Sequence, residues 1–512
     1  MKDATKRQLR LPSVVEALLP VITMVVLMVY VYGFSNEAYD AAHLPLIIGI
    51  VVAFAVGIFC GHSFQDMMDG IIERITATME AILILLTVGL LVSSFMISGT
   101  IPTLIYYGLD LLSPQFFLPA GCLLTAIVGL ACGSSWTATA TIGIAFMTIG
   151  SGLGMNPAIT AGMVISGAYV GDKFSPLSDT TNLAAGVSET GLFDHVTAMV
   201  STTAPVFVIS LVLYTIIGFV FSNGAGYQPE IADGIRTAIA ENFNTNPLVL
   251  LPVLVIVVVC VMRVPGIPGV LISVLTGVVF SLIFQETRSL GDIFSILHYG
   301  PTIETGNEFL DAALAKGGME NQMWTINLII LAVAFGGALE RAGVIERLFG
   351  KLKRSIHTVR GLVLATMATS IFCDAAMCDQ FLGIGVPAPL YADKYDELGL
   401  ARNMMSRTLE DAGTLWAVMF PWTACGAYQA RTLGISPLQF FPFAFVNLLN
   451  PIYALATAWF GRNIFWADGA YTNILGKTKL KTPAEAPEDV HEVAMANLKA
   501  MRADGRAPQV EA

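Results

Sequence analysis

The sequence predicts an all-α polytopic membrane protein, arranged as an inverted-topology repeat with interrupted helices. Three observations lead to this fold class. Of 512 residues, 55% are hydrophobic and only 13% are charged, whereas soluble proteins carry about 25% charged residues. Apolar runs close to the length of a membrane span recur along the chain. Polar motifs then interrupt the apolar sequence at similar places in its two halves.

The apolar runs are the candidate spans. Several are shorter than the roughly 20 residues that a spanning helix needs, which indicates buried or interrupted helices. The first run is too long for a secretory signal and has no small-residue cleavage site after it, so it is interpreted as the first span. The runs are Val15–Phe34, Leu44–Gly61, Ile82–Ile97, Pro119–Cys132, Pro205–Phe221, Pro247–Met262, Gly266–Phe284, Ile326–Leu339, Gly361–Cys373 and Phe440–Phe460.

The distribution of charge predicts the topology. Lysine and arginine gather before the first run and in 340–360, whereas acidic residues predominate in 223–245 and 286–323. Because basic loops favour the cytoplasmic side, we expect the N-terminus and 340–360 inside, and the two acidic segments outside. This predicts a multi-pass protein of the cytoplasmic (inner) membrane, with the lipid bilayer as its surroundings.

The two halves enter the membrane from opposite sides. In this topology, 82–97 crosses outward and 326–339 crosses inward. Each is followed by a pair of polar motifs, at 131–141 and 171–182 in the first half and at 369–380 and 406–416 in the second. Gly152-Leu153 with Ala158 also has a faint likeness to Gly399-Leu400 with Ala401. Similar segments of opposite orientation predict an inverted repeat.

Five regions follow from this organisation. Residues 1–80 hold N-terminal spans and an interfacial helix (His62–Glu80), and 81–204 form the first transport repeat. Residues 205–323 hold connecting spans and an external loop, and 324–460 form the second transport repeat. Residues 461–512 form a polar tail, which the run from Thr482 to Asp489 predicts to be solvated or disordered.

The stretch Gly171–Asn182 (GDKFSPLSDTTN) is the most polar of the motifs. Pro176 should break the helix near Phe174–Ser175, and broken helices coordinate ions in transporters. Sodium, a hard cation, should prefer oxygen ligands, and such groups follow the break: Asp179, Thr180, Thr181 and Asn182. The alternative is a loop at the membrane surface, in which Asp172 and Lys173 are a solvated pair.

Gly133–Thr141 (GSSWTATAT) is rich in hydroxyls. Hydroxyl side chains can simply bond to helix backbone or allow close packing. Glycine and serine also cluster here as a re-entrant turn would require, and Trp136 stands alone among small residues. The candidate lining residues are Ser134, Ser135, Trp136 and Thr137.

The second half carries a matching set of carboxylates. Asp374 and Asp379 would face about 140° apart on one continuous helix, so they can share a site only if the backbone turns between them. Glu410 and Asp411 are adjacent, and Arg407 lies four residues before Asp411, which allows an internal ion pair. Thr414 shares the face of Asp411. Structural ion pairing is the alternative interpretation of these charges.

The motifs together carry a family resemblance. Gly133–Trp136, Gly167–Tyr169, Gly171–Lys173, Ser175–Asn182, Ser406–Thr414, Pro421-Trp422 and Cys425–Tyr428 resemble the NhaC-type sodium/proton antiporter family, with a match from about residue 14 to residue 460. The resemblance implies re-entrant hairpins, a moving transport domain and a homodimer. It implies a substrate path lined by Ser134, Ser135, Trp136, Thr137, Asp172, Ser175, Ser178, Arg407 and Trp422. Thr137 departs from the pattern, because glycine is more usual there.

The sequence thus predicts secondary active exchange of sodium for protons by alternating access. Asp179 and Asp411, from opposing halves, are predicted to share the sodium ion or a proton, with Thr180, Asn182, Asp374, Asp379, Glu410 and Thr414 around them. The alternative is a sodium- or proton-coupled antiporter of small organic acids (malate and lactate, for instance) or amino acids, since relatives of that family also move such ions.

Other classes lack support in the sequence. An organic anion would need a fixed cation, and the candidates Lys173, Arg402, Arg407 and Arg431 lie near predicted interfaces or acidic partners. No nucleophile elbow, H-E-x-x-H, P-loop or basic–aromatic pattern occurs, so neither an enzyme nor a nucleic-acid partner is predicted. No cofactor is expected other than sodium as transported or coupling ion.

Overall fold

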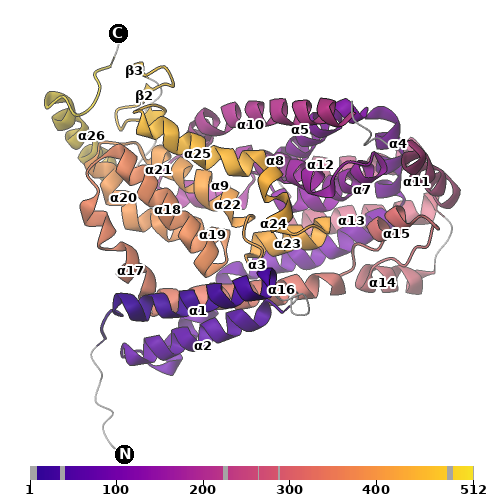
Figure 1. The fold of residues 1–512 in the computed structure, drawn as a ribbon, viewed down its shortest axis with the longest axis horizontal. Coiled ribbons are helices and arrows are strands. Elements are labelled where there is room, and N and C mark those ends of the chain that lie inside the picture. The colour runs from indigo at the N-terminus through magenta and orange to yellow at the C-terminus, as the bar shows by residue number, and fades with distance from the viewer. Residues whose placement is uncertain are drawn as a thin grey trace, which may run out of the picture.

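The structure is a computed structural model that describes residues 9–34, 41–222, 229–262, 264–285, 289–480 and 488–510. Among these residues, seven helices are long and apolar enough to cross a membrane, or up to nine if two bent helix pairs each count as one span. The prediction of an all-α polytopic membrane protein is confirmed, because only a small three-stranded sheet accompanies the helices (Figure 1).

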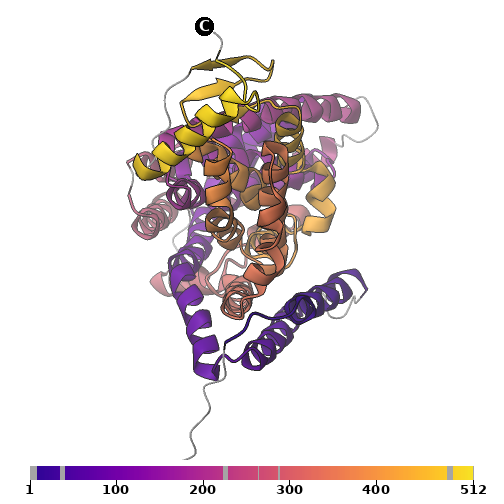
Figure 2. The same ribbon diagram turned by 90° about the vertical axis from the view of Figure 1, so that its left-hand side faces the viewer.

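The N-terminal part of the chain forms long helices that pack beside the second repeat. α1 and α2 form an antiparallel hairpin, and α2 and α3 both pack against α16. Figure 2 shows the α1–α2 hairpin at the edge of the molecule. The elements are α1 (Val14–Gly33), α2 (His43–Phe59), α3 (Phe64–Ile97) and α4 (Thr100–Leu111).

A separate interfacial helix at His62–Glu80 was predicted, and the structure differs. α3 runs without interruption from Phe64 to Ile97, because no proline or turn motif separates the charged segment from the apolar one. Its charged half is held by ion pairs to α16, between Arg74 and Glu340 and between Arg341 and Asp66. The predicted boundary between residues 80 and 81 therefore falls inside one helix.

α3 and α16 run in opposite directions. The ion pairs above join the start of α3 to the end of α16, whereas Gly89, near the other end of α3, lies against Gly318 and Gln322. This antiparallel contact is the orientation that the inverted repeat requires.

The first half continues through a series of short and broken helices. They are α5 (Pro114–Cys132), α6 (Ser135–Ala138), the π-helix η1 (Thr139–Gly143), α7 (Ile144–Gly152), α8 (Pro157–Phe174), α9 (Asp179–Val187) and α10 (Leu192–Ser222). α8 packs mainly on α5. Since α10 is continuous, the predicted boundary between 204 and 205 also falls inside a helix.

Connecting elements join the two halves. They are α11 (Pro229–Asn242), the 3₁₀-helix η2 (Pro247–Leu250), α12 (Leu251–Val261), α13 (Gly266–Phe284), α14 (Leu290–Tyr299), α15 (Glu308–Leu314) and the 3₁₀-helix η3 (Glu320–Gln322). Figure 1 shows α11, α14 and α15 at one end of the molecule, and α17, α20 and α26 at the other. This separates the segments predicted outside from 340–360, predicted inside.

The second half repeats the order of the first. It comprises α16 (Met323–Arg341), α17 (Val344–Phe349), the 3₁₀-helix η4 (Leu352–Ser355), α18 (Val359–Met377), α19 (Gln380–Gly385), α20 (Pro387–Glu397), α21 (Arg402–Leu409), the π-helix η5 (Glu410–Thr414), α22 (Leu415–Ala417), α23 (Ala424–Leu433), α24 (Pro437–Phe440), the 3₁₀-helix η6 (Phe441–Phe443) and α25 (Phe445–Trp459).

The repeat extends to the backbone dihedral angles. α5 and α18 each have 19 residues, and each ends in a left-handed residue, Gly133 (φ 64°) or Cys378 (φ 61°). The next residue is extended in both halves, Ser134 at φ −155° and Asp379 at φ −144°. At the same sequence offset, the left-handed Gly154 corresponds to Gly399. The predicted alignment of Gly399 with Gly152 was therefore wrong by two residues.

The C-terminal tail, predicted to be solvated or disordered, is folded in the residues that the structure describes. β1 (Ile464–Phe465), β2 (Ala470–Thr472) and β3 (Thr478–Leu480) form an antiparallel sheet in that order, and α26 (Glu488–Ala503) packs on α20. The polar composition of the tail conceals a few apolar anchors, Phe465, Trp466 and Leu498, which are all buried. Most of the run from Thr482 lies outside the described residues.

Candidate functional site

The first helix break lies where proline predicts it. α8 ends at Phe174, Ser175 is its C-cap, and α9 begins after Ser178, whose hydroxyl accepts from the Thr181 N–H. Asn182 Nδ2 donates to the carbonyls of Pro176 (3.0 Å) and Ser178 (2.7 Å). Asn182 therefore holds the turn between the half-helices, and its side chain is committed to backbone groups. Ser175 is fully buried within this turn.

The hydroxyl-rich motif forms a second turn beside that break. After Gly133, the Ser134 hydroxyl caps α6 by accepting from the Thr137 N–H (3.2 Å). The helix then passes through the π-helical segment η1, a form that is frequent at functional sites. Gly133 packs directly on Leu177, since a Cβ at Gly133 would lie 2.7 Å from that side chain. The two polar motifs of the first half are thus in contact.

In the second half, the backbone turns between Asp374 and Asp379, as a shared site would require. Cys378 adopts the left-handed conformation, and Asp379 then caps α19 by accepting from the Phe381 N–H (3.4 Å). Asp374 is fully buried, and within the described part of the chain neither of its carboxylate oxygens has a hydrogen-bond partner. Gly383 leaves space for it, because a Cβ there would collide with Asp374 Oδ1.

Asp411 and Lys173 form a fully buried ion pair that joins the two halves. Asp411 Oδ1 also accepts from Thr202 Oγ1 (3.1 Å) and Asn450 Nδ2 (2.8 Å), and Arg407 Nε lies 3.6 Å from Oδ2. Lys173 is therefore not a solvated surface residue. The carboxylate predicted to share sodium with Asp179 is instead neutralised by a lysine from the opposing repeat.

Glu410, next to Asp411 in η5, is a fully buried carboxylate. Both of its carboxylate oxygens lack a hydrogen bond among the residues that the structure describes. Thr180 and Thr414 lie beside it, and the charges of Lys173 and Asp172 face it. A buried charge without donors is costly, so this group needs either a proton or a cation.

Asp172 and Asp179 open into a cavity of about 310 Å³, which we call the acidic cavity. Ser135 and Ser178 lie beside Asp172, and the charges that face Asp179 are those of Asp172 and Glu80. Residues lining the acidic cavity include Glu80, Ser134, Ser135, Trp136, Thr137 and Thr180. The lining continues to Val264–Gly266, between α12 and α13, in a segment that the predicted topology places on the cytoplasmic side.

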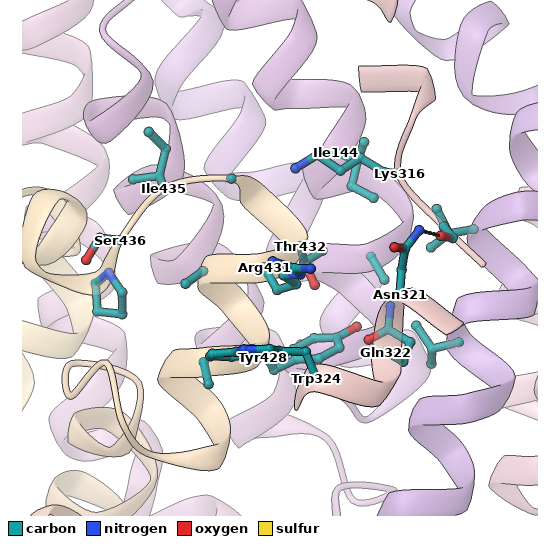
Figure 3. Close-up of a pocket in the computed structure, with 18 of the residues that line it drawn as sticks. Ile144, Lys316, Asn321, Gln322, Trp324, Tyr428, Arg431, Thr432, Ile435 and Ser436 are labelled. Carbon is teal, nitrogen blue, oxygen red and sulfur yellow. Dashed lines mark hydrogen bonds between the residues drawn. The ribbon is translucent and has the colours of Figure 1, made fainter. Parts of the chain in front are cut away.

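A second, larger cavity of about 530 Å³ lies across an aromatic barrier; we call it the basic cavity because Lys316 and Arg431 line it (Figure 3). Trp136 of the acidic cavity stacks on Tyr428 of the basic cavity at 4.6 Å between centroids, and Tyr428 Oη donates to the Trp136 carbonyl (3.1 Å). Val88 lines both cavities. One stacked pair thus separates two compartments.

Two predicted lining residues have other roles. Arg407 Nη1 donates to the Asn463 carbonyl (2.7 Å), and its guanidinium lies over Phe465, so it joins Asp411 to the C-terminal tail. Trp422 Nε1 donates to the Ala375 carbonyl (2.8 Å), which fixes the second helix break against α18. Neither residue lines the acidic or the basic cavity.

Sequence reasoning missed Glu80, Thr202, Asn450 and Tyr428. Glu80 could have been identified from the sequence, because it is a lone carboxylate next to an apolar run. Thr202 and Asn450 could not, because the sequences of their helices contain none of the polar motifs. Within the described ranges, no cluster of three or more His, Cys, Asp or Glu side chains could hold a metal ion. The oxygens around Asp172, Asp179 and Glu410 come from carboxylates and hydroxyls together, a set suited to a hard cation.

Two inverted repeats with broken helices, and buried carboxylates between them, define a secondary active transporter of cations. Residues 167–462 match the family described as the Na+/H+ antiporter family, and the chain belongs to that family.

Relatives cover nearly the whole chain. The chain is 37% identical to the Na(+)/H(+) antiporter NhaC of Alkalihalophilus pseudofirmus over 82% of this chain and 90% of the relative. It is 34% identical to the arginine/ornithine antiporter ArcD of Halobacterium salinarum over 94% and 96% of the two chains. It is 31% identical to the malate-2H(+)/Na(+)-lactate antiporter of Bacillus subtilis over 90% and 97%.

Proposed function

We propose that this protein exchanges sodium for protons across the cytoplasmic membrane by alternating access, with its N-terminus in the cytoplasm. The observation that carries the proposal is Glu410, a fully buried carboxylate whose two oxygens have no hydrogen-bond partner within bonding geometry among the described residues. The hydroxyl groups of Thr180 and Thr414 lie beside it, and the charges of Asp172 and Lys173 of the opposing repeat face it. Such a group can bind either a proton or a cation.

In this proposal, sodium is held between Asp172 and Glu410, whose charges face each other, with Ser135, Ser178 and Thr180 supplying hydroxyl oxygens. Asp179 faces Asp172 in the acidic cavity and attracts the cation to it. A proton on Glu410 removes the charge that holds sodium, so each ligand expels the other. The earlier prediction that Asp179 and Asp411 share one cation requires Lys173 to leave Asp411 first. Lys173 faces both Asp411 and Glu410, so its movement would couple the two carboxylates.

The rest of the proposal concerns access and assembly. The Trp136–Tyr428 pair closes the acidic cavity from the basic cavity, and its opening together with closure at 264–266 would expose the site to the other side. A homodimer is proposed from the family resemblance.

The test is sodium-driven pH change in proteoliposomes that contain a fluorescent pH indicator. Wild-type protein should acidify or alkalinise the lumen according to the direction of the sodium gradient, and Glu410→Gln should abolish this change. Glu397→Gln is the matched control, because Glu397 is an exposed glutamate of α20 paired with Lys394. Full exchange by Glu410→Gln and by Asp172→Asn would rule out this site.

A second candidate is antiport of small organic acids or amino acids. It is favoured by the basic cavity and by the two relatives whose names specify malate with lactate and arginine with ornithine. Uptake of labelled malate or arginine, measured in the same proteoliposomes, distinguishes the two functions.

A further inference from the structure

The basic cavity holds two cations without a carboxylate. Lys316 and Arg431 both line it, and in the described part of the chain the side chain of neither residue forms an ion pair or donates a hydrogen bond. Figure 3 shows Arg431 between Lys316 and the rings of Trp324 and Tyr428. Like charges in a partly enclosed space repel each other, and an anion between them would relieve that repulsion.

Lys316 is strongly constrained in this position. It lies over the end of α23, since a Cβ at Gly434 would be 3.0 Å from Lys316 Nζ. Burial, together with the charge of Arg431, lowers the pKa of Lys316. The negative end of the α23 dipole offsets part of this cost, but Lys316 donates no hydrogen bond to the helix carbonyls within the described ranges. Its three N–H donors therefore remain available to a ligand.

Arg431 provides the complementary half of the site. Its guanidinium lies over the Trp324 ring at 5.7 Å from the centroid, which fixes the plane of the group without using its N–H donors. A planar guanidinium can bind a carboxylate through two parallel hydrogen bonds. The Ser436 hydroxyl, which accepts from the backbone at the start of α24, can still donate its own proton to an anion, and Ser436 lines the same cavity.

We propose that the basic cavity binds a small carboxylate anion between Lys316 and Arg431, with Trp324 and Tyr428 as an aromatic floor. The cavity volume, about 530 Å³, falls within the range of small-molecule sites. The site is distinct from the acidic cavity, where carboxylates would repel the same ligand. It does not require that the protein exchange sodium for protons.

The test measures binding of succinate and acetate to the full-length protein in nanodiscs of neutral lipid by isothermal titration calorimetry. Lys316→Gln and Arg431→Gln should each weaken binding about tenfold or more, because each removes a charge-assisted contact. Arg236→Gln is the matched control: Arg236 also lies over a tyrosine ring, Tyr106, but it is paired with Asp110. The Arg236→Gln variant should bind succinate and acetate with the affinity of the wild type.

Three outcomes would overturn the proposal. They are an absence of saturable binding to wild-type protein, equal affinity in all variants, and equal or tighter binding of inorganic phosphate, which would make the site a general anion site. Nanodiscs that contain phosphatidylglycerol identify a lipid headgroup as the occupant if that lipid abolishes succinate binding, and this result would also overturn it. Sodium-driven pH change in the same variants is a separate measurement, so failure of the anion site and failure of sodium/proton exchange are distinguishable.

Discussion

The buried pair of Lys173 and Asp411 should show strong energetic coupling. Removing one member of a buried ion pair costs about 3–5 kcal/mol, because the other charge is left uncompensated. The loss of unfolding free energy in Lys173→Met should be near the lower end of this range, because Asp411 keeps Thr202 and Asn450 as hydrogen-bond donors and Arg407 as a nearby positive charge. Asp411→Asn should cost less unfolding free energy than a substitution that removes the whole side chain. The reason is that the amide oxygen of the asparagine can still accept a hydrogen bond from Lys173.

The double variant Lys173→Met/Asp411→Asn removes both charges together. We expect the double variant to lose about 2 kcal/mol less unfolding free energy than the two single variants lose together. This difference is within the range of coupling energies between residues in one network. Titration with sodium dodecyl sulfate in mixed micelles gives the free energy of unfolding. The control cycle uses Lys394 and Glu397, a pair with the glutamate largely exposed, where coupling should stay below about 1 kcal/mol. Additive losses at Lys173 and Asp411 would refute the pairing.

Three further results are expected. As pH falls, half-saturating sodium should rise about tenfold per pH unit where one proton competes for the site, whereas a pH-independent affinity would exclude competition at Glu410. Cysteines placed at Lys353 and Glu304, in a background without native cysteines, should react with an impermeant reagent from opposite sides; labelling from one side contradicts the topology. Tyr428→Ala should join the two cavities and let sodium leak without proton exchange. Tyr428→Phe keeps the stacking on Trp136, so its sodium and proton fluxes should stay coupled. If Tyr428→Ala shows no sodium leak and keeps coupled exchange, the stacked pair is not the barrier.

The sequence was sufficient wherever local chemistry decides the structure. Apolar length predicted the long helices, and Pro176 placed the break within a residue of where α8 ends. Helix geometry alone also showed that Asp374 and Asp379 could share a site only if the backbone turned between them, and the structure has such a turn at Cys378.

Sequence reasoning failed where distant contacts decide. Lys173 and Asp411 lie far apart in the chain, so a motif analysis could treat Lys173 only as half of a local pair with Asp172. The tail appeared disordered because a few buried side chains such as Trp466 matter more than its average polarity. α3 was divided because its charged half finds partners on α16, which composition does not reveal.

The backbone of the site is duplicated, but its charges are not. At the offset that relates Gly133 to Cys378, the hydroxyl caps Ser178 and Thr423 also correspond. The same offset places Ala417 opposite Asp172, Ile165 opposite Glu410 and Ser166 opposite Asp411. Each of these carboxylates therefore occurs once, and Asp411 has its lysine partner in the other repeat.

This asymmetry decides what the repeat can do. Two inverted copies of one backbone can exchange conformations and so open a site to either side, but the carboxylates that we propose for the cation site occur in one copy only. The aromatic barrier is not duplicated either: at the same offset, the counterparts of Trp136 and Tyr428 are Phe381 and Leu183, and a leucine cannot form an aromatic stack. The stacked pair therefore occurs once, and alternating access would need another contact to close the acidic cavity when this pair opens.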